Sequence, residues 1–368
     1  MRLINEQDIE FLATGAALLG AGGGGDPYLG KLMAQKCIRQ YGPVKMLHPS
    51  EISDQDYIIP TNMMGAPTIM MEKIPNGDEA LKSLRKLEQF TGQKAFATMP
   101  VECGGLNSTI PFVVAALAGL PLIDADGMGR AFPELQMETF NILGVSATPA
   151  VLYNERGDHV IIESLDNDMF EYIARGIAVR MGGVAHCAMY GMSGKDVKKT
   201  SIQGTMTLCI ELGEAIHQAR LNKADPVEAI KAITRRSIYG EALVLFEGKV
   251  TDVERRSTDG FVRGKALVSG MNTYEGLQLK VDFQNENLFA TVDGEPVAMV
   301  PDLITFLDKE TGTPVTTEGL KYGFRVICLG IPTPPIMRSP KAIEVWGPRY
   351  FGYDIDYQAI ESIHSSRS

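Results

Sequence analysis

The chain has 368 residues, 45% hydrophobic and 22% charged, a composition typical of a globular protein long enough for two domains. Its formal net charge of −10 and the lack of any Lys/Arg-rich block argue against nucleic acid or an anionic membrane surface as a partner. The sequence contains no run of 18 apolar residues that would predict a membrane span, and its five scattered cysteines include no Cys-x-x-Cys pair, which argues against a disulfide framework and a structural zinc finger. Its first residues lack the charged-then-apolar order of a signal peptide, so we expect a cytoplasmic protein with reduced thiols.

Two predicted helices flank a run of glycines near the start of the sequence. Asn5 is a good N-cap for a helix over Glu6–Leu19, and Asp26 and Pro27 open a second helix to about residue 40. Gly20–Gly25 matches the pattern G-x-G-x-x-G, but a dinucleotide fingerprint follows a strand, whereas here a helix precedes the glycines. We therefore interpret the run as a close-approach junction between helices. The alternative is an anion cradle in a nucleotide-dependent enzyme.

From residue 56 onward, predicted strands and helices alternate. Short apolar runs at Tyr57–Thr61, Ala95–Val101 and Pro121–Asp124 predict three strands, with helices over about 78–91 and 110–118 between them and a loop over 62–67 after the first. This alternation predicts an α/β fold: a three-layer N-terminal domain over residues 1–165 with a largely parallel sheet. Loops after parallel strands meet at one edge of the sheet, where ligands bind, so we expect polar side chains from all three loops to converge. They are Asn62, Glu102, Asn107, Asp124 and Asp126.

The third of these loops carries the densest group of ionic and amide side chains: Asp124, Asp126, Arg130, Glu134 and Gln136. Two carboxylates this close repel each other unless a cation, a metal or a shared proton compensates. We therefore predict a catalytic site, with Asp126 as general base, Glu134 as the next candidate, and Arg130 between the carboxylates or on the substrate. Asp124, at the strand end, is expected to be the more buried aspartate and to be structural or metal-holding. The alternative is an ion-paired turn in which Arg130 satisfies both aspartates.

In the second half of the chain, the predicted secondary structure changes from a hairpin to helices and then to short strands. A hairpin over 150–163 ends the first predicted domain, and Asp166–Met181 has the pattern of an amphipathic helix. We expect a C-terminal domain over 166–368 that is mainly helical over 166–240 and β-rich over 241–360, where short alternating runs are separated by turn signals. This β-rich module is predicted to be a barrel or a sandwich.

Two sets of residues raise the question of metal or thiol chemistry. Imidazole and thiolate are good zinc ligands, so His186 and Cys187 are candidate metal ligands, and a divalent metal such as zinc is the candidate cofactor. Adjacent residues of a strand point to opposite faces, however, and the alternative is a core cysteine beside a polar histidine. Cys103, beside Glu102, is a candidate nucleophile.

Three motifs together resemble the S-methyl-thiohydantoin desulfurase-like family. They are Glu102–Asn107 (ECGGLN), Asp124–Gln136 (DADGMGRAFPELQ) and Tyr190–Gly194 (YGMSG), and the tail motif at Trp346–Asp354 is also similar to the carboxyl end of hydantoinase and oxoprolinase subunits. The resemblance implies a hydrolase or desulfurase that acts on a five-membered imidazolidinone ring carrying sulfur at the carbon between its nitrogens. In that reading Glu102, Asp124, Asp126, Arg130 and Glu134 are the candidate catalytic residues. Asn62, Gly105, Asn107, Gln136 and Ser193 are the candidate substrate-binding residues.

Other functions remain open at this point. The likeness of the tail to multi-subunit hydantoinases suggests a non-catalytic partner subunit or a small-ligand-binding module, and the glycine run suggests the nucleotide-dependent enzyme mentioned above. We expect a small-molecule substrate in each case, and the sequence leaves open whether the chain forms a homo-oligomer.

Overall fold

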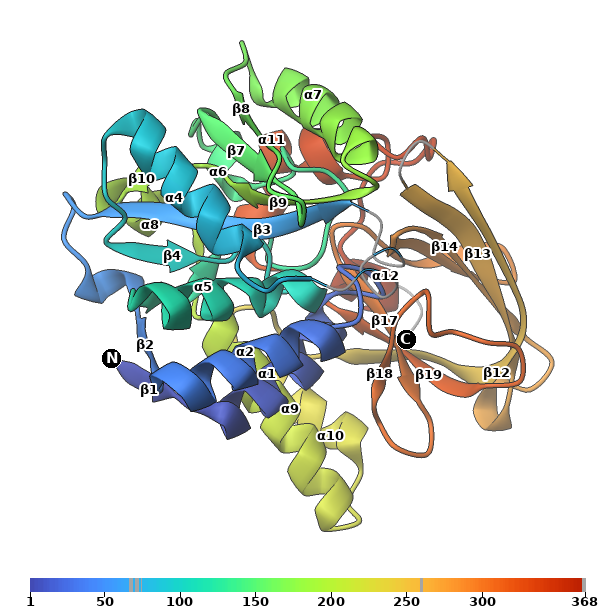
Figure 1. Cartoon of the computed structure of the whole chain (residues 1–368). Helices are drawn as coiled ribbons and strands as arrows, with labels where there is room; N and C mark the ends of the chain where they lie inside the picture. The colour runs from blue at the N-terminus through green and yellow to red at the C-terminus, as the bar shows by residue number, and fades with distance from the viewer. Residues whose placement is uncertain (66–68, 70–72, 74, 259–260, 366–368) are drawn as a thin grey trace.

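Alternating strands and capped helices build an α/β part from the first half of the chain, and a β-rich part follows it (Figure 1). The computed structural model describes residues 1–65, 69, 73, 75–258 and 261–365. Within them, a nine-stranded sheet has the order β1-β2-β5-β4-β3-β9-β7-β8, with β10 also paired to β3. Its strands are β1 (Arg2–Ile4), β2 (Val44–Leu47), β3 (Tyr57–Gly65), β4 (Ala97–Met99), β5 (Leu122–Ile123), β7 (Ala150–Tyr153), β8 (His159–Ile162), β9 (Val184–Ala188) and β10 (Met192–Ser193).

The three predicted strands form the parallel core of this sheet. Ile58 of β3 is in register with Ala97 of β4, Thr98 of β4 pairs with Leu122 of β5, and both pairings are parallel. The flanking pairs of β3 with β9 and of β7 with its neighbours are antiparallel, so the sheet is partly parallel rather than largely parallel. The first strand is also longer than predicted: residues 62–65 continue β3 instead of forming a loop, and Ala66 and Pro67 lie outside the described residues.

Helices cover both faces of the sheet and give the expected three layers. Adjacent strand residues face opposite sides: Ile59 packs in a cluster with residues of α4 (Glu79–Thr91) and α5 (Ile110–Ala118). Ile58 packs in another cluster with residues of α7 (Asn167–Arg180) and α8 (Gly194–Thr200). Because α7, α8, β9 and β10 belong to this layered structure, the sheet continues past residue 165. The division of the chain near that residue stays a prediction.

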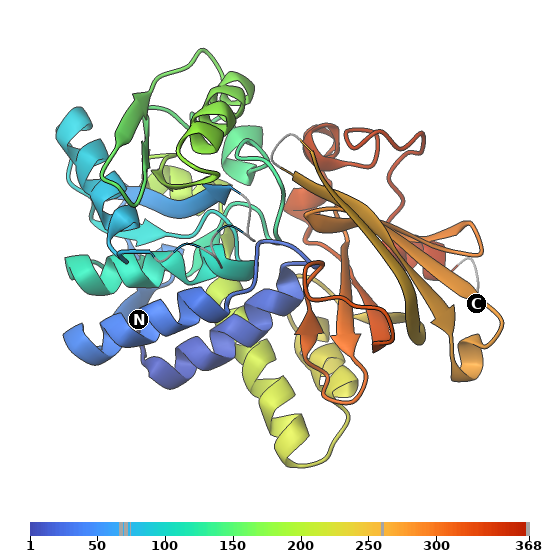
Figure 2. The same cartoon turned by 45° about the vertical axis from the view of Figure 1, so that its right-hand side comes forward.

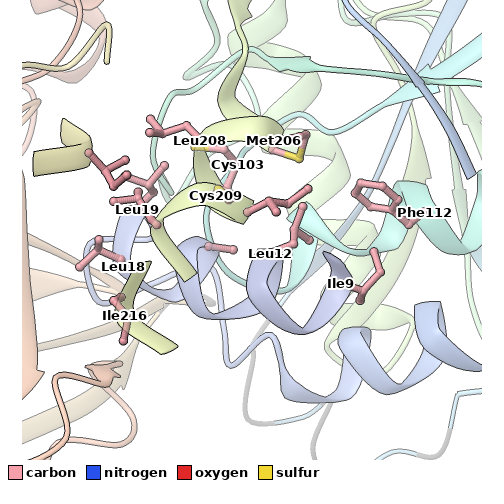
Figure 3. Packing of buried hydrophobic residues seen from close by; sticks show 14 of the residues in the cluster. Ile9, Leu12, Leu18, Leu19, Cys103, Phe112, Met206, Leu208, Cys209 and Ile216 are labelled. Carbon is pink, nitrogen blue, oxygen red and sulfur yellow. The ribbon is translucent and has the colours of Figure 1, made fainter. Parts of the chain in front are cut away.

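A further helical layer packs beside α5. It consists of α1 (Glu6–Leu19), α2 (Tyr28–Tyr41), α9 (Thr205–Leu221) and α10 (Pro226–Arg235). Figure 3 shows Leu12 of α1 close to Cys209 of α9, with Cys103 from the loop after β4 in the same apolar cluster. The two helices approach so closely that a Cβ at Gly15 would lie 1.9 Å from the carbonyl oxygen of Cys209. Glycine is therefore required at position 15 for steric reasons. This helix packing supports the loop after β4 that carries Cys103.

The β-rich part is an eight-stranded antiparallel sheet in the described residues, with the order β16-β15-β14-β13-β12-β19-β17-β18 (Figure 2). Its strands are β12 (Leu243–Thr258), β13 (Phe261–Gly270), β14 (Gln278–Gln284), β15 (Glu286–Val292), β16 (Glu295–Met299), β17 (Leu303–Asp308), β18 (Pro314–Val315) and β19 (Arg325–Ile331).

The remaining elements are short: β6 (Ala125–Asp126), β11 (Ile202–Gln203), α6 (Thr139–Ile142), α11 (Pro340–Trp346), α12 (Ile360–Ser365), and the 3-10 turns at Pro49–Glu51, Gly105–Ser108, Asn272–Tyr274 and Pro335–Arg338. None of the helices in the described part of the chain is long and apolar enough to cross a membrane.

The glycine run joins the two parts of the molecule. α1 ends at Leu19 as predicted, and the run lies against the loop after β4, where Gly24 accepts a hydrogen bond from the N–H of Leu106 at 2.9 Å. On its other side, Ala21 accepts one from the N–H of Asn287 at 2.8 Å, at the start of β15. A Cβ at Gly105 would lie 2.3 Å from the backbone of Gly24. The structure therefore supports the close-approach interpretation of the run.

Candidate functional site

A small cavity lies where β3 and the loop after β4 meet the start of β15. Its volume is about 50 Å³, which is room for a few water-sized groups. The residues that line it come from both parts of the molecule, and the polar ones are Asn62, Glu102, Asn107, Glu134, Arg175, Asn285 and Glu286. Four of these, Asn62, Glu102, Asn107 and Glu134, are candidates from the sequence. The convergence of the strand ends thus brings part of the predicted site together.

Asn62 presents a buried amide group to the cavity. The side chain is 1% exposed, and neither its Nδ2 nor its Oδ1 forms a hydrogen bond with another described residue. Buried polar groups are nearly always paired, because leaving one unpaired costs about 1 to 3 kcal/mol. An unpaired donor and acceptor side by side on a cavity wall mark a position for a ligand that supplies the complementary acceptor and donor.

Glu102 is held in place by the other predicted asparagine. Nδ2 of Asn107 donates to Oε1 of Glu102 at 2.6 Å, and the same amide exchanges hydrogen bonds with the backbone of Met63, at 2.7 Å to its N–H and 2.9 Å to its carbonyl. Oε2 of Glu102 has no partner. Burial raises the pKa of Glu102 well above its usual range, and the negative charges of Glu286 and Asp126 raise it further. This environment favours the protonated form of Glu102, which makes Glu102 a candidate proton donor.

Glu286 brings a second carboxyl group to the cavity from the β-rich part. Its Oε1 accepts the N–H of Gly24 at 3.1 Å, and its Oε2 is unpaired. Burial raises the pKa of Glu286 to about 8, although the charge of Arg130 and the Gly24 hydrogen bond act in the opposite direction. The cavity therefore holds two carboxyl groups in different environments: the positive charge of Arg130 acts on Glu286, whereas the negative charges of Glu286 and Asp126 act on Glu102.

Glu134 and Arg175 lie at the mouth of the cavity. Both also line a larger groove of about 1600 Å³ that runs along α7. Oε2 of Glu134 accepts hydrogen bonds from Nε2 of Gln136 at 2.5 Å and from the hydroxyl of Tyr350 at 2.6 Å. Arg175 forms an ion pair with Glu171 at 2.6 Å. Gln136 thus reaches the site through Glu134, and it lines the groove rather than the cavity.

The two aspartates do not line the cavity, and their predicted order of burial is wrong. Asp126 is 0% exposed and Asp124 is 6% exposed. Oδ2 of Asp126 accepts the backbone N–H groups of Cys103, Met128 and Gly129, at 2.8, 3.2 and 2.7 Å. The turn that was predicted to expose Asp126 instead folds around the Asp126 side chain, because the backbone amides of the turn need a hydrogen-bond acceptor. Burial nevertheless raises the pKa of Asp126 to about 6.

Asp124, for which we predicted a structural or metal-holding role, contacts the start of α9. It accepts the N–H of Thr207 at 3.0 Å and the hydroxyl of Thr207 at 2.5 Å, in the first turn of α9. The first N–H groups of a helix have no partner within the helix, and a carboxylate there both accepts a hydrogen bond and favours the positive end of the helix dipole. Asp124 therefore anchors α9 to the end of β5.

Arg130 contacts neither aspartate, so both its predicted place between them and the alternative of an ion-paired turn are wrong. The guanidinium is 0% exposed and donates to four backbone carbonyls. They belong to Ala131 (3.1 Å), Asn287 (2.8 Å), Pro301 (3.2 Å) and Asp302 (2.9 Å), and all but the first lie in the β-rich part. Burial lowers the pKa of Arg130 to about 10. Arg130 joins the two parts of the molecule and stabilises the wall behind Glu286.

Three further candidates lie away from the cavity wall. Gly105 packs against the glycine run, as described above. Ser193 caps α8 by accepting the N–H of Asp196 at 3.1 Å, and it lines a separate cleft with Asp54. Cys103 is fully buried, and its Sγ lies 3.9 Å from the hydroxyl of Tyr239. Burial raises the pKa of the Cys103 thiol well above its usual range, which disfavours the nucleophilic thiolate.

The structure does not bring His186 and Cys187 together as metal ligands. Cys187 packs in the apolar cluster that contains Phe170 of α7. His186 instead lines a small cleft with Glu79 and Glu155, which lies on the other side of the sheet. β9 is regular here, so the two side chains point in opposite directions. In the described ranges, no group of three or more His, Cys, Asp or Glu side chains is arranged to hold a metal ion.

Sequence reasoning missed Glu286 and Arg175. The polar run Gln284–Asn287 is an available signal, because it interrupts two alternating strands with four consecutive polar residues. Arg175 lies in the predicted amphipathic helix and carries no local signal that separates it from other helix cations. Both reach the cavity only through long-range packing.

Comparison with known proteins identifies the family. A crystal structure of a protein from Chromobacterium violaceum matches 98% of this chain and 100% of its own with a TM-score of 0.80 and 23% sequence identity, which shows a shared fold. No curated protein matches the chain. The family models described as S-Me-THD-like, N-terminal domain and S-Me-THD-like, C-terminal domain match residues 7–164 and 165–360. The chain therefore belongs to the S-Me-THD-like family, the S-methyl-thiohydantoin desulfurase-like family that its motifs resemble.

Proposed function

We propose that the chain is a hydrolase that removes the sulfur substituent from a small thiohydantoin-like ring bound in the cavity lined by Asn62, Glu102 and Glu286. The observation that carries the proposal is the pair of unpaired carboxyl oxygens beside the unpaired Asn62 amide. An imidazolidinone ring presents N–H and C=O groups at neighbouring positions, and the Asn62 amide complements such a pair. Membership of the S-Me-THD-like family supports the same substrate class.

The proposed reaction needs a base, an acid and a position for water. Water adds to the ring carbon that carries sulfur, so that a C–O bond forms, the C–S bond breaks, and the sulfur leaves as a thiol with one proton. Glu286, whose ionised form is favoured by the nearby charge of Arg130, takes a proton from the water. Glu102, whose protonated form is favoured by the nearby charges of Glu286 and Asp126, donates to the departing sulfur.

The cavity also suggests how the substrate is oriented. Its small volume leaves no room for a large substituent, and its mouth opens at Glu134 and Arg175 onto the groove along α7. We therefore place the ring in the cavity and its substituent in the groove. Water exclusion inside the cavity strengthens every electrostatic interaction with the ring.

The test is thiol release by the purified chain from S-methyl-thiohydantoins with different ring substituents, followed with a thiol reagent and by mass spectrometry of the ring product. Glu102→Gln and Glu286→Gln should each lower the turnover rate by roughly 10²-fold or more, the usual scale for losing a general acid or base. Glu88→Gln is the matched control, because Glu88 is a buried carboxylate held by Arg85 and Lys94 at the end of α4, away from the cavity. Full turnover in both cavity variants would contradict the proposal.

A further inference from the structure

One face of α7 carries a row of apolar side chains that the described residues leave exposed. Leu165 just before the helix is 95% exposed, and Met169, Tyr172 and Val179 on the helix are 47%, 78% and 55% exposed. They follow one another at spacings of four, three and seven residues, so they form a single stripe that begins just before the helix and continues along it. Figure 1 places α7 at the upper margin of the molecule. A contiguous exposed stripe of this kind is typical of an interaction surface.

A glycine interrupts the stripe at its middle. Gly176 is exposed, and a Cβ built on it would meet no atom within 4 Å. Glycine in a helix interior costs about 1 kcal/mol relative to alanine, and the fold of the single chain gives no steric reason for it here. The missing side chain leaves a hollow beside Tyr172, which is the largest residue of the stripe.

The stripe is complementary to itself when a second copy of the helix lies antiparallel to it. In an antiparallel pair with its two-fold axis at the level of residue 174, residues whose numbers are equally far from 174 lie at the same height. Tyr172 of one copy then faces Gly176 of the other, a large side chain against the hollow. Met169 faces Val179 in the same way, one apolar side chain against another.

The charges at the ends of the stripe obey the same symmetry. Asp168 lies six residues before position 174 and Arg180 six residues after it, both are exposed, and neither forms an ion pair within the described residues. Antiparallel pairing places Asp168 of each copy opposite Arg180 of the other, so that two complementary charge pairs flank the apolar centre. A two-fold interface must be self-complementary in this way.

We propose that this face of α7 is the interface of a homodimer in which two α7 helices pack antiparallel about a two-fold axis near residue 174. The helix has 14 residues and is roughly 21 Å long at about 1.5 Å per residue. A contact of this length alone buries less than the roughly 800 Å² per partner of a standard interface, so we expect a dimer of moderate affinity. The proposal does not depend on the proposed reaction.

The pairing also affects the groove described above. Tyr172, Gly176 and Val179 belong to the wall of that groove, which meets the cavity at Glu134 and Arg175. A second copy on α7 therefore covers part of the groove next to the mouth of the candidate site.

Sedimentation measurements on the full chain over a range of concentrations test the proposal. We expect a concentration-dependent dimer whose dissociation constant rises about tenfold or more in Tyr172→Ser, as for loss of an aromatic residue at the centre of an interface. Tyr322→Ser is the matched control, because Tyr322 is 75% exposed and lies in the β-rich part. Circular dichroism of each variant checks that the fold is kept.

A charge exchange tests the antiparallel geometry. Asp168→Arg and Arg180→Asp should each weaken the dimer, because each places like charges opposite one another, whereas the double variant Asp168→Arg/Arg180→Asp should restore it. A wild-type chain that stays monomeric at every concentration would overturn the proposal. So would a dimer that Tyr172→Ser leaves unchanged, or a double variant as weak as the single ones.

Discussion

Glu286 of β15 accepts a hydrogen bond from the backbone N–H of Gly24 at 3.1 Å, across 262 positions of the sequence. The contact occupies an amide that an anion cradle would need and uses it to orient a carboxyl group of the candidate site. A Cβ at the neighbouring Gly23 would lie 2.2 Å from Oε1 of Glu286. The glycine run therefore has two roles, as a close-packed junction and as a support for the cavity wall.

The pKa of Glu286 predicts how stability depends on pH. Burial raises this pKa to about 8 from its ordinary value of 4.5, so between these values the folded state binds a proton that the unfolded state has released. The free energy of unfolding therefore falls as the pH rises from about 4.5 to about 8 and changes no further on this account above that. In Glu286→Gln, the melting temperature should fall less over this range than in the wild type. Parallel pH profiles for the two proteins would show that Glu286 is already ionised when folded.

The pKa of Glu286 also predicts how catalysis depends on pH, and the rate is expected to rise with pH where stability falls. If ionised Glu286 is the base, kcat/KM of the proposed reaction rises with pH and levels off above about 8. The rate measurement at each pH checks this, and the structural control Glu88→Gln should follow the wild-type profile. A rate that declines between pH 5 and 8 would remove Glu286 from the role of base.

Asn62 should show opposite effects on binding and on stability. Its buried amide has no partner in the free protein, so Asn62→Leu, which is similar in size, should leave the melting temperature unchanged or raise it. The same substitution should raise KM by about tenfold or more, since a ring N–H and C=O lose their partners. Thermal melts and steady-state rates measure the two effects. A large loss of stability would mean that the amide has a structural partner.

Arg130 should matter for stability rather than for the chemical step. Its buried guanidinium donates to four carbonyls, three of them in the β-rich part. Arg130→Lys keeps the charge but loses the planar fork, so it should lower the free energy of unfolding by about 3 kcal/mol. Denaturant unfolding gives the value, with Arg349→Lys as control, since the Arg349 side chain is 59% exposed. An unchanged free energy would show that lysine satisfies the same carbonyls.

Asp124 should behave as a helix cap. Asp124→Ala removes the acceptor for both the N–H and the hydroxyl of Thr207 and should cost about 1 kcal/mol of stability. Asp124→Asn keeps one acceptor oxygen and should cost less. Denaturant unfolding of both variants ranks them, and equal losses would indicate that the charge, rather than the hydrogen bond, anchors α9.

The sequence by itself determined the elements whose causes are local. Helical spacing and the Asn5 cap predict α1 with its observed ends, and the alternation after residue 56 predicts the parallel pairing of β3, β4 and β5, which brings Asn62 and Glu102 to one cavity. The family motif is local in the same sense, because it consists of neighbouring residues.

Only the tertiary structure decided which carboxyl groups face the cavity and which are structural. Asp126 is buried because the amides of its own turn and the amide of Cys103, from the neighbouring loop, need an acceptor, and Arg130 donates to carbonyls more than 150 positions away. Glu286 reaches the cavity from the β-rich part, and its local polar run does not indicate which distant segment it will meet. The physical reason is that periodicity and turn chemistry report the conformation of a short segment, whereas burial and hydrogen-bond partners depend on what packs against that segment.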